Sequence, residues 1–351
     1  MTAPAPLRPA DALDGFVLPL ELEATRPPET RGVRRDQVRL MVSDRNGIRH
    51  RVFRDLPSEL RAGDLVVVNN SATLPASVVI DGDLVVHFST ELPGGLHVVE
   101  LRRLSGAGSL PHEDPRAGRL HLPGGGTIEL LTPYPVGGGS HRLWVATASV
   151  GRPLVEYLET WGRPIRYRHT DGPYPLDAYQ TIFARVSGSA EMPSAGRPFT
   201  DRLVTALMTA GIAVAPLTLH TGVSSLEAGE DPYPEWFEIP ESTASLVNHT
   251  RANGGRVIAV GTTVVRALET TVDAKGLSHP GRTWTDLVIG SDHALGVVDG
   301  LITGWHEPQS THLDLLEAVA GRRRLAESYR NALEQGYMWH EFGDSHLIVP
   351  G

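Results

Sequence analysis

Residues 256–270 read RVIAVGTTVVRALET and carry the clearest secondary-structure pattern in the chain. The apolar, β-branched run 256–260 predicts a buried strand. Gly261-Thr262-Thr263 then predicts a turn, and residues 264–271 predict a helix. A strand that leads through a short turn into a helix is the repeating unit of α/β folds.

The alternation of strands and helices continues on both sides of this unit. The further predicted elements are a strand at 65–68, a helix at 154–161, a helix from Thr200 to Gly211, a strand at 212–219, strands at 287–289 and 301–303, and helices at 310–320 and 322–334. This order predicts an α/β layer structure for most of the chain.

Residues 73–150 show a different pattern. Short β-branched runs recur about every ten residues, separated by Gly, Pro, Asp and Ser, with no helical pattern between them. Such spacing is typical of a small barrel or sandwich. We therefore predict an α/β main domain, residues 1–72 plus 151–351, interrupted by a small β-barrel domain at 73–150.

Composition excludes several classes of site. The chain has 351 residues, which suggests two or three domains, and it has no cysteine. Disulfides, Cys-ligated zinc, iron–sulfur clusters and a thiol nucleophile are thereby excluded. The net charge of −9 argues against a protein whose whole surface binds nucleic acid. A local basic patch is compatible with this net charge.

The N-terminal region is rich in proline and lacks the apolar core of an export signal. No run approaches the roughly 18 apolar residues of a membrane span. We expect a cytoplasmic protein without a membrane partner.

The turn Gly261-Thr262-Thr263 is the first candidate site. Backbone N–H groups at a helix start favour an anion or a polarised oxygen, and two hydroxyls add donors. Arg266 lies one turn further on and is expected to share that face. The alternative is a helix cap beside a surface arginine.

Two of the fifteen histidines follow predicted strands. His220 comes after 212–219, and His306 comes after 301–303. Ligands of α/β folds bind at strand carboxyl ends, where a neutral imidazole can act as a base. The alternative is a histidine that only hydrogen-bonds at a strand end. No spacing of histidines indicates a metal site, and no Gly-x-Ser-x-Gly elbow indicates a hydrolase.

Several segments, in order along nearly the whole chain, resemble the S-adenosylmethionine:tRNA ribosyltransferase-isomerase family of queuosine biosynthesis. They are residues 35–40, 63–69, 179–181 with 188–196, 217–222, 256–269, and a tail containing residues 298–299, His306, 310–311, 320–321 and 343–344. Each segment alone is weakly specific, but their shared order indicates homology.

The resemblance implies a discontinuous α/β domain with an inserted β-barrel. It also implies transfer and isomerisation of the ribosyl part of S-adenosylmethionine onto a 7-aminomethyl-7-deazaguanine in the tRNA anticodon. Epoxyqueuosine forms, and adenine and methionine leave. The implied co-substrate is S-adenosylmethionine, the implied partner is the tRNA anticodon loop, no metal is implied, and we expect a monomer.

The chain departs from the family pattern at several polar positions. Asn70, Ser71 and Ala72 stand where the family usually has Asp-Thr-Arg. In the segment that usually holds two histidines and a glutamate, only Glu235 matches. Such losses remove positioned hydrogen bonds. Glu191 and Glu307 are polar groups that the family pattern lacks. They either compensate for the lost groups or change which substrate is bound.

Three interpretations stay open at this point. They are the family reaction on tRNA, a related transferase acting on another acceptor such as a small molecule, and a binding protein without catalysis. For the family reaction, we expect His220 or His306 to act as the base and Glu235 to act as an orienting group. Tyr179 and Gln180 are expected on a loop over the nucleoside, and Asp344 is expected near the sulfonium or a hydroxyl. The residues expected to contact polar atoms of the substrate are Gly261, Thr262, Thr263, Arg266 and Ser310.

Overall fold

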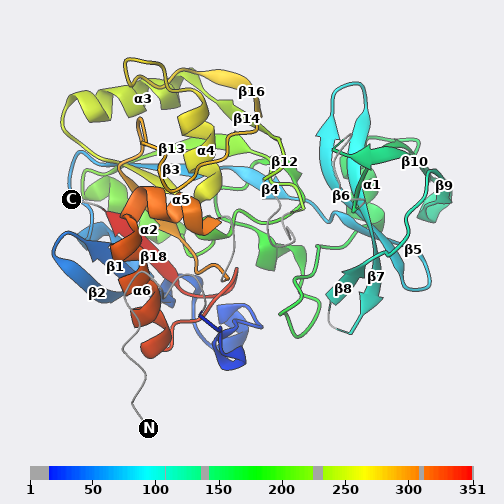
Figure 1. Cartoon of the computed structure of the whole chain (residues 1–351), viewed down its shortest axis with the longest axis horizontal. Coiled ribbons are helices and arrows are strands. Elements are labelled where there is room, and N and C mark those ends of the chain that lie inside the picture. The colour runs from blue at the N-terminus through cyan, green and yellow to red at the C-terminus, as the bar shows by residue number, and fades with distance from the viewer. Residues whose placement is uncertain (1–15, 107, 136–141, 224–231, 308–311, 350–351) are drawn as a thin grey trace, which may run out of the picture. The chain divides into compact units, whose positions relative to one another are not determined.

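The computed structural model describes residues 16–106, 108–135, 142–223, 232–307 and 312–349 (Figure 1). The chain divides into two compact units. The first has the bounds Met1–Asn69, Ser194–Thr218 and Leu226–Gly351, and the second has the bounds Asn70–Pro193 and Leu219–Ser225. The domain boundaries at 73 and 150 stay a prediction.

The first unit contains a mixed sheet of nine strands in the order β16-β14-β13-β3-β15-β17-β18-β1-β2. Its strands are β1 (Arg39–Asp44), β2 (Gly47–Val52), β3 (Leu65–Asn69), β13 (Ala213–Leu219), β14 (Glu235–Ile239), β15 (Val257–Val260), β16 (Gly281–Thr285), β17 (Gly300–Thr303) and β18 (Ser345–Val349). Its helices are α2 (Asp201–Thr209), α3 (Glu241–Ala252), α4 (Thr262–Thr270), α5 (His312–Ala320) and α6 (Arg322–Glu334).

The centre of this sheet is parallel. Strand β3 pairs in parallel with both β13 and β15, and β15 pairs in parallel with β17. All residues of β3, β15 and β17 are buried, as their apolar sequences predict. Helices α3 and α4 pack against β3 and β15. The carboxyl ends of β15 and β17 therefore meet at one edge of the sheet, where the chain turns into Gly261 and Gly304.

The predicted strand–turn–helix unit is present as β15 and α4. The helix begins at Thr262, two residues earlier than expected. Gly261 occupies the cap position with φ of +91°, a backbone conformation that favours glycine. Thr200 caps α2 as predicted, because its side chain accepts a hydrogen bond from the Leu203 N–H.

The second unit contains an antiparallel sheet with the pairing order β5-β6-β7-β11-β10-β9, in which β8 also pairs with β7. Its elements are β4 (Ser71–Thr73), β5 (Ser77–Asp81), β6 (Leu84–Leu92), β7 (Leu96–Ser105), β8 (Gly108–Pro111), β9 (Gly118–His121), β10 (Thr127–Tyr134), β11 (Leu143–Ser149), β12 (Val186–Ser189) and α1 (Leu154–Trp161). The predicted barrel is thus seen as a half-barrel, since pairing among the described residues runs from β5 to β9 without closing.

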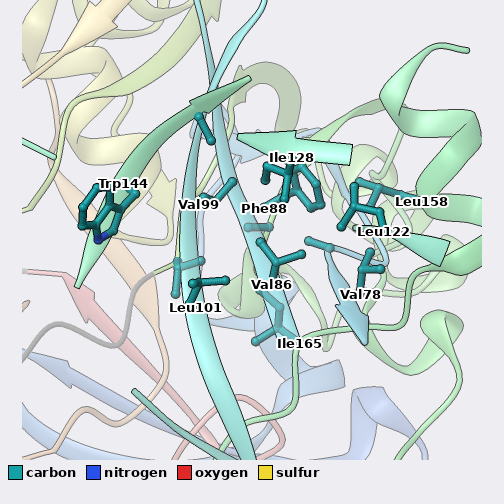
Figure 2. Close-up of a cluster of buried hydrophobic side chains, with 14 of the residues drawn as sticks. Val78, Val86, Phe88, Val99, Leu101, Leu122, Ile128, Trp144, Leu158 and Ile165 are labelled. Carbon is teal, nitrogen blue, oxygen red and sulfur yellow. The ribbon is translucent and has the colours of Figure 1, made fainter. Parts of the chain in front are cut away.

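One face of this half-barrel sheet forms the core of the second unit (Figure 2). Val86 and Phe88 of β6 lie beside Val99 and Leu101 of β7, as the alternation of side chains along strands requires. Helix α1 contributes the buried Leu158 to the same cluster. The short strands β4 and β12 of the same unit pair with each other in a separate two-stranded sheet.

Some elements differ from the prediction. Residues 287–289 form no strand, and β16 (Gly281–Thr285) lies just before them. Helix α3 was missed because its sequence, ESTASLVNHTRA, is largely polar and begins after a proline rather than a capping hydroxyl. Strands β14 and β18 were also missed. No helix in the described part of the chain is long and apolar enough to cross a membrane.

Because two histidines are buried, we predict that acid destabilises the protein. Burial, with a smaller effect of the Arg102 charge, lowers the pKa of His87 to about 3, and burial lowers the pKa of His346 to about 3. The unfolded chain takes up protons near pH 6.5, whereas the folded chain does not until far lower pH. Between pH 6.5 and 5, each histidine should therefore lower the free energy of unfolding by about 2 kcal/mol.

Urea unfolding at pH 7.5 and at pH 5 measures this loss. In His346→Gln, where the titrating group is gone, the dependence on pH should be weaker by one proton. An equal dependence in both proteins would contradict the prediction.

Candidate active site

The candidate residues form two groups, one in each compact unit. In the second unit, His220 directly follows β13 and joins a chain of hydroxyl groups. Its Nδ1 lies 2.8 Å from Ser71 Oγ, and Ser71 Oγ lies 2.6 Å from Ser189 Oγ. The backbone N–H of Thr221 donates to Ser189 Oγ over 3.0 Å. One nitrogen of the ring is thereby tied to a buried polar network.

The parallel pair of β4 and β12 positions this network. Ser71 lies on β4 and Ser189 on β12, and the register between the two strands shifts between Ser187 and Ser189. The shift occurs at Gly188, where an ideal Cβ would lie 2.5 Å from the ring atoms of His220. Real Cβ atoms do not approach other atoms so closely. The backbone at Gly188 therefore packs directly on the imidazole and fixes its position.

Burial lowers the pKa of His220 to about 4. The ring is accordingly neutral at physiological pH. A neutral imidazole has one nitrogen that donates and one that accepts, so it can serve as a base or as a hydrogen-bond donor without adding charge.

Tyr179 and Gln180 bind the neighbouring strand. The Gln180 side chain accepts from the Thr73 N–H over 3.0 Å and donates to the Thr73 carbonyl over 2.8 Å, as a paired strand would. The Tyr179 carbonyl accepts from the Thr73 hydroxyl over 2.8 Å. The Gln180 amide thus holds β4 in place, which favours a positioning role over the predicted loop above a nucleoside.

In the first unit, the turn Gly261-Thr262-Thr263 begins α4 as expected, but Arg266 is engaged by the protein. Its Nε donates to the Leu287 carbonyl over 2.9 Å, and its Nη1 donates to Glu235 Oε2. Its Nη2 lies 3.4 Å from each of the carbonyls of Tyr233 and Thr285.

The Arg266 guanidinium, expected to hold an anion of the substrate, therefore ties α4 to β14 and β16. Glu235, expected to orient a ribose hydroxyl, is its ion partner. The structure favours a structural role for both residues.

His306 lies at the end of β17 beside a second histidine. Its Nε2 lies 3.0 Å from Thr303 Oγ1, and its ring stacks on the ring of His312 with centroids 4.7 Å apart. Burial, then the charges of His312 and His340, lowers the pKa of His306 well below its usual value. Burial and the Arg266 charge lower the pKa of His312 to about 4. Both rings are neutral at physiological pH.

Asp344 is buried and faces the backbone. Its Oδ1 accepts from the Arg39 N–H over 2.7 Å, and its Oδ2 accepts from the Met338 N–H over 2.8 Å. Burial raises the pKa of this carboxyl, and the two backbone hydrogen bonds oppose that rise. The arrangement favours a structural role, in which Asp344 joins two backbone segments, over the predicted contact with a sulfonium. Ser310 lies outside the described residues.

We expect Asp344→Asn to lower stability but not the turnover of folded enzyme. An amide replaces one accepting oxygen by a donor, which then faces a backbone N–H, at a cost of about 1–3 kcal/mol. Urea unfolding measures the loss, and kcat per folded molecule tests the role. A large fall in kcat at unchanged stability would instead indicate contact with substrate.

Three site residues were not predicted. Ser71 was noted only as a departure from the family pattern, and Ser189 only as part of a motif. His312 lies six residues after His306 and was not considered. The available signal was the position of these hydroxyl and imidazole groups next to strand ends, but their partners are far away in sequence.

Comparisons with known proteins cover nearly the whole chain. A family model described as "Queuosine biosynthesis protein" matches residues 14–348. A relative from Symbiobacterium thermophilum, named S-adenosylmethionine:tRNA ribosyltransferase-isomerase, is 36% identical over an alignment of 348 positions that covers 95% of this chain and 98% of the relative. A relative of the same name from Gloeobacter violaceus is 34% identical over 360 residues, covering 96% and 95% of the two chains.

A solved structure is also similar. The crystal structure of an S-adenosylmethionine tRNA ribosyltransferase from Thermotoga maritima matches with a TM-score of 0.52 at 28% identity. The match covers 96% of this chain and 100% of that one. The similarity therefore extends from sequence to fold.

Proposed function

The chain belongs to the queuosine biosynthesis protein family, and from this premise we propose that it is an S-adenosylmethionine:tRNA ribosyltransferase-isomerase. The observation that carries the proposal is the match over residues 14–348, which spans both compact units rather than one of them. The resemblance read from the motifs is confirmed by these comparisons.

The reaction joins S-adenosylmethionine to tRNA. The ribosyl group moves to the amine of a 7-aminomethyl-7-deazaguanine in the anticodon loop and is rearranged to an epoxycyclopentanediol, while adenine and methionine leave. S-adenosylmethionine is consumed as a co-substrate, and no metal is invoked. A monomer in the cytoplasm, where tRNA is found, is the proposed working form.

The first chemical step removes a proton from the carbon beside the sulfonium. That step needs an unprotonated base, and His220 and His306 are the candidates. Their lowered pKa keeps both rings unprotonated at neutral pH, so neither has to lose a proton before acting. The positive sulfonium acidifies the adjacent carbon, which suits a base of low pKa.

The remaining residues divide into substrate-facing and supporting groups. We propose that Thr262 and Thr263 at the start of α4, together with Ser310, meet polar atoms of the substrate. The ion pair of Arg266 with Glu235 joins the same helix to β14. We further propose that the half-barrel at 73–150 is a domain inserted into the α/β domain of 1–72 and 151–351.

A second candidate is a transferase acting on another acceptor. It is favoured by Asn70 and Ala72, which stand where the family pattern has a carboxylate and a guanidinium. The loss of both groups alters the charge at the start of β4. Retention of a hydroxyl at Ser71, which binds His220, argues against a protein without catalysis.

Incubation with S-adenosylmethionine tests the proposal. Adenine and methionine are measured by chromatography, with tRNA bearing the 7-aminomethyl-7-deazaguanine and, as a control, the same tRNA bearing guanine. Release that requires the modified base supports the family reaction. Binding of S-adenosylmethionine without release would favour another acceptor, and neither binding nor release would favour a protein without this chemistry.

A further inference from the structure

One segment of the second unit carries positive charge without a balancing carboxylate. Residues 160–170 contain Arg163, Arg166 and Arg168 and no Asp or Glu. Arg163 and Arg168 are exposed, and Arg166 is half-buried. None of the three forms an ion pair with a carboxylate of the described residues. Even the Nε atom of Arg166, which is shielded from solvent, has no acceptor among those residues. Three like charges therefore lie close together along the chain without a counter-charge.

The arginines of the half-barrel in the same unit are neutralised instead. Each arginine between residues 73 and 150 pairs with a carboxylate at an N–O distance of 2.5–3.2 Å. The pairs are Arg102 and Arg142 with Glu100, Arg103 with Asp83, Arg116 with Asp114, and Arg119 with Glu129. A general abundance of arginine in the sequence does not explain this difference between the two parts of one unit.

The half-barrel holds the backbone of the basic segment in place. The Arg163 N–H donates to the Ser77 carbonyl over 2.8 Å, and the Ser77 N–H donates to the Arg163 carbonyl over 2.9 Å. Ile165 is buried in the core cluster of the sheet (Figure 2). The Cα atom of Arg168 lies 3.2 Å from an ideal Cβ at Gly108. The guanidinium groups thus extend from an ordered backbone, which lowers the entropy cost of binding a partner.

Aromatic rings accompany these arginines. Trp161, at the end of α1, is 42% exposed, whereas tryptophan is highly buried on average. Its indole ring packs on Gly124, where an ideal Cβ would lie 2.7 Å from the indole Nε1. Tyr167 lies between two of the arginines and stacks on His169 with ring centroids 5.7 Å apart. In RNA recognition, guanidinium groups bind phosphates and aromatic rings stack on unpaired bases.

We propose that residues 161–168 form a tRNA-binding surface, in which Arg163, Arg166 and Arg168 bind backbone phosphates and Trp161 stacks on a base. The proposal rests on the proposed function, because tRNA is the partner that the proposed reaction requires. The whole chain has a net charge of −9, so a polyanion needs a local positive surface to approach it. An acidic protein would use the arginines but not the exposed indole ring, whereas single-stranded RNA uses both.

The salt dependence of tRNA binding tests the phosphate contacts. The variant Arg163→Gln/Arg166→Gln/Arg168→Gln removes three charges, and fluorescence anisotropy measures its affinity for tRNA bearing the 7-aminomethyl-7-deazaguanine. Each lost phosphate contact lowers the slope of log K against log salt concentration by about 0.7–1. Between about 50 and 200 mM salt, the slope should therefore fall by about 2–3 and the affinity by about tenfold to a hundredfold. An unchanged slope would overturn the proposal.

The matched control is Arg103→Gln/Arg116→Gln/Arg119→Gln. It removes the same charge from the same unit, at exposed arginines that already have acidic partners. Its slope should equal that of the wild-type protein, and urea unfolding should give similar midpoints for all three proteins. Equal losses of affinity in the two triple variants would also overturn the proposal, because overall charge rather than this surface would then bind the RNA.

An alanine at position 161 tests the stacking contact. Trp161→Ala should weaken tRNA binding by about fivefold or more, and the salt slope should stay unchanged because the ring carries no charge. Leu104→Ala is the matched control, because Leu104 is an apolar side chain of the same unit with a similar exposure of 41%. A Trp161→Ala protein that binds tRNA as tightly as the wild-type protein would overturn the stacking contact.

Failure of this surface is distinguishable from failure of the proposed function. If the wild-type protein binds tRNA and releases adenine, but the triple variant of the basic segment binds with an unchanged slope, the surface is wrong and the function stands. If the wild-type protein does not bind tRNA, the proposed function is wrong and this surface is wrong with it.

Discussion

Replacing Gly188 with alanine should lower adenine release by about a hundredfold while the fold stays intact. The added Cβ would lie 2.5 Å from Cε1, Nδ1 and Nε2 of His220, so the ring must move. A displacement of about 1 Å at a catalytic group costs on the order of a hundredfold in rate. The strand pairing of β12 with β4 uses backbone groups that the methyl group leaves in place. Single-turnover rates with S-adenosylmethionine and modified tRNA measure the effect.

Gly172→Ala is the matched control. Gly172 lies in the same compact unit, and a Cβ there would meet nothing within 4 Å. Its rate should equal that of the wild-type protein, and thermal unfolding should show similar midpoints for all three proteins. A Gly188→Ala protein that keeps its rate would mean that the position of the His220 ring is irrelevant to the reaction.

Local patterns in the sequence predicted the strand–turn–helix unit of β15 and α4 well. Strand β15 is a continuous apolar run, and Gly261 marks the point where the chain needs a positive φ. Regular spacing of short strands predicted a small barrel where the structure has a half-barrel. Closure of a barrel depends on pairing between distant strands, which spacing does not encode. Helix α3 has a polar sequence and is stabilised by packing against β3 and β15, so its own pattern is weak.

The candidate site was harder to predict, because the type of a residue does not reveal its partners. Arg266 and Gln180 are residue types that often bind substrates, and both follow suitable elements. In the structure, their donors are taken up by the carbonyls of Leu287 and Thr73, which are distant in sequence. Ser71 contacts His220 across 149 positions. Such contacts follow from the fold of the whole chain.

The buried ion pair leads to the second large effect, which is on stability. Glu235→Gln should lower the free energy of unfolding by about 3–5 kcal/mol, because it leaves the buried Arg266 guanidinium without its counter-charge. The pair lies between α4 and β14, and among the described residues the other Arg266 donors reach neutral carbonyls. Urea unfolding followed by circular dichroism measures the change.

The matched control is Glu238→Gln, on the same strand β14. Glu238 pairs with Arg282 at 3.7 Å, but both side chains are exposed, so solvent screens the pair and its loss should be barely measurable. Arg266→Lys should also lower the free energy of unfolding, since an ammonium cannot reach the carboxylate and the carbonyls together. Equal small effects of the two glutamine substitutions would contradict the structural role. A Glu235→Gln protein of normal stability but without turnover would instead indicate that Glu235 takes part in the reaction. A residue that holds α4 on β14 lowers stability when it is replaced, whereas a residue that contacts substrate lowers turnover.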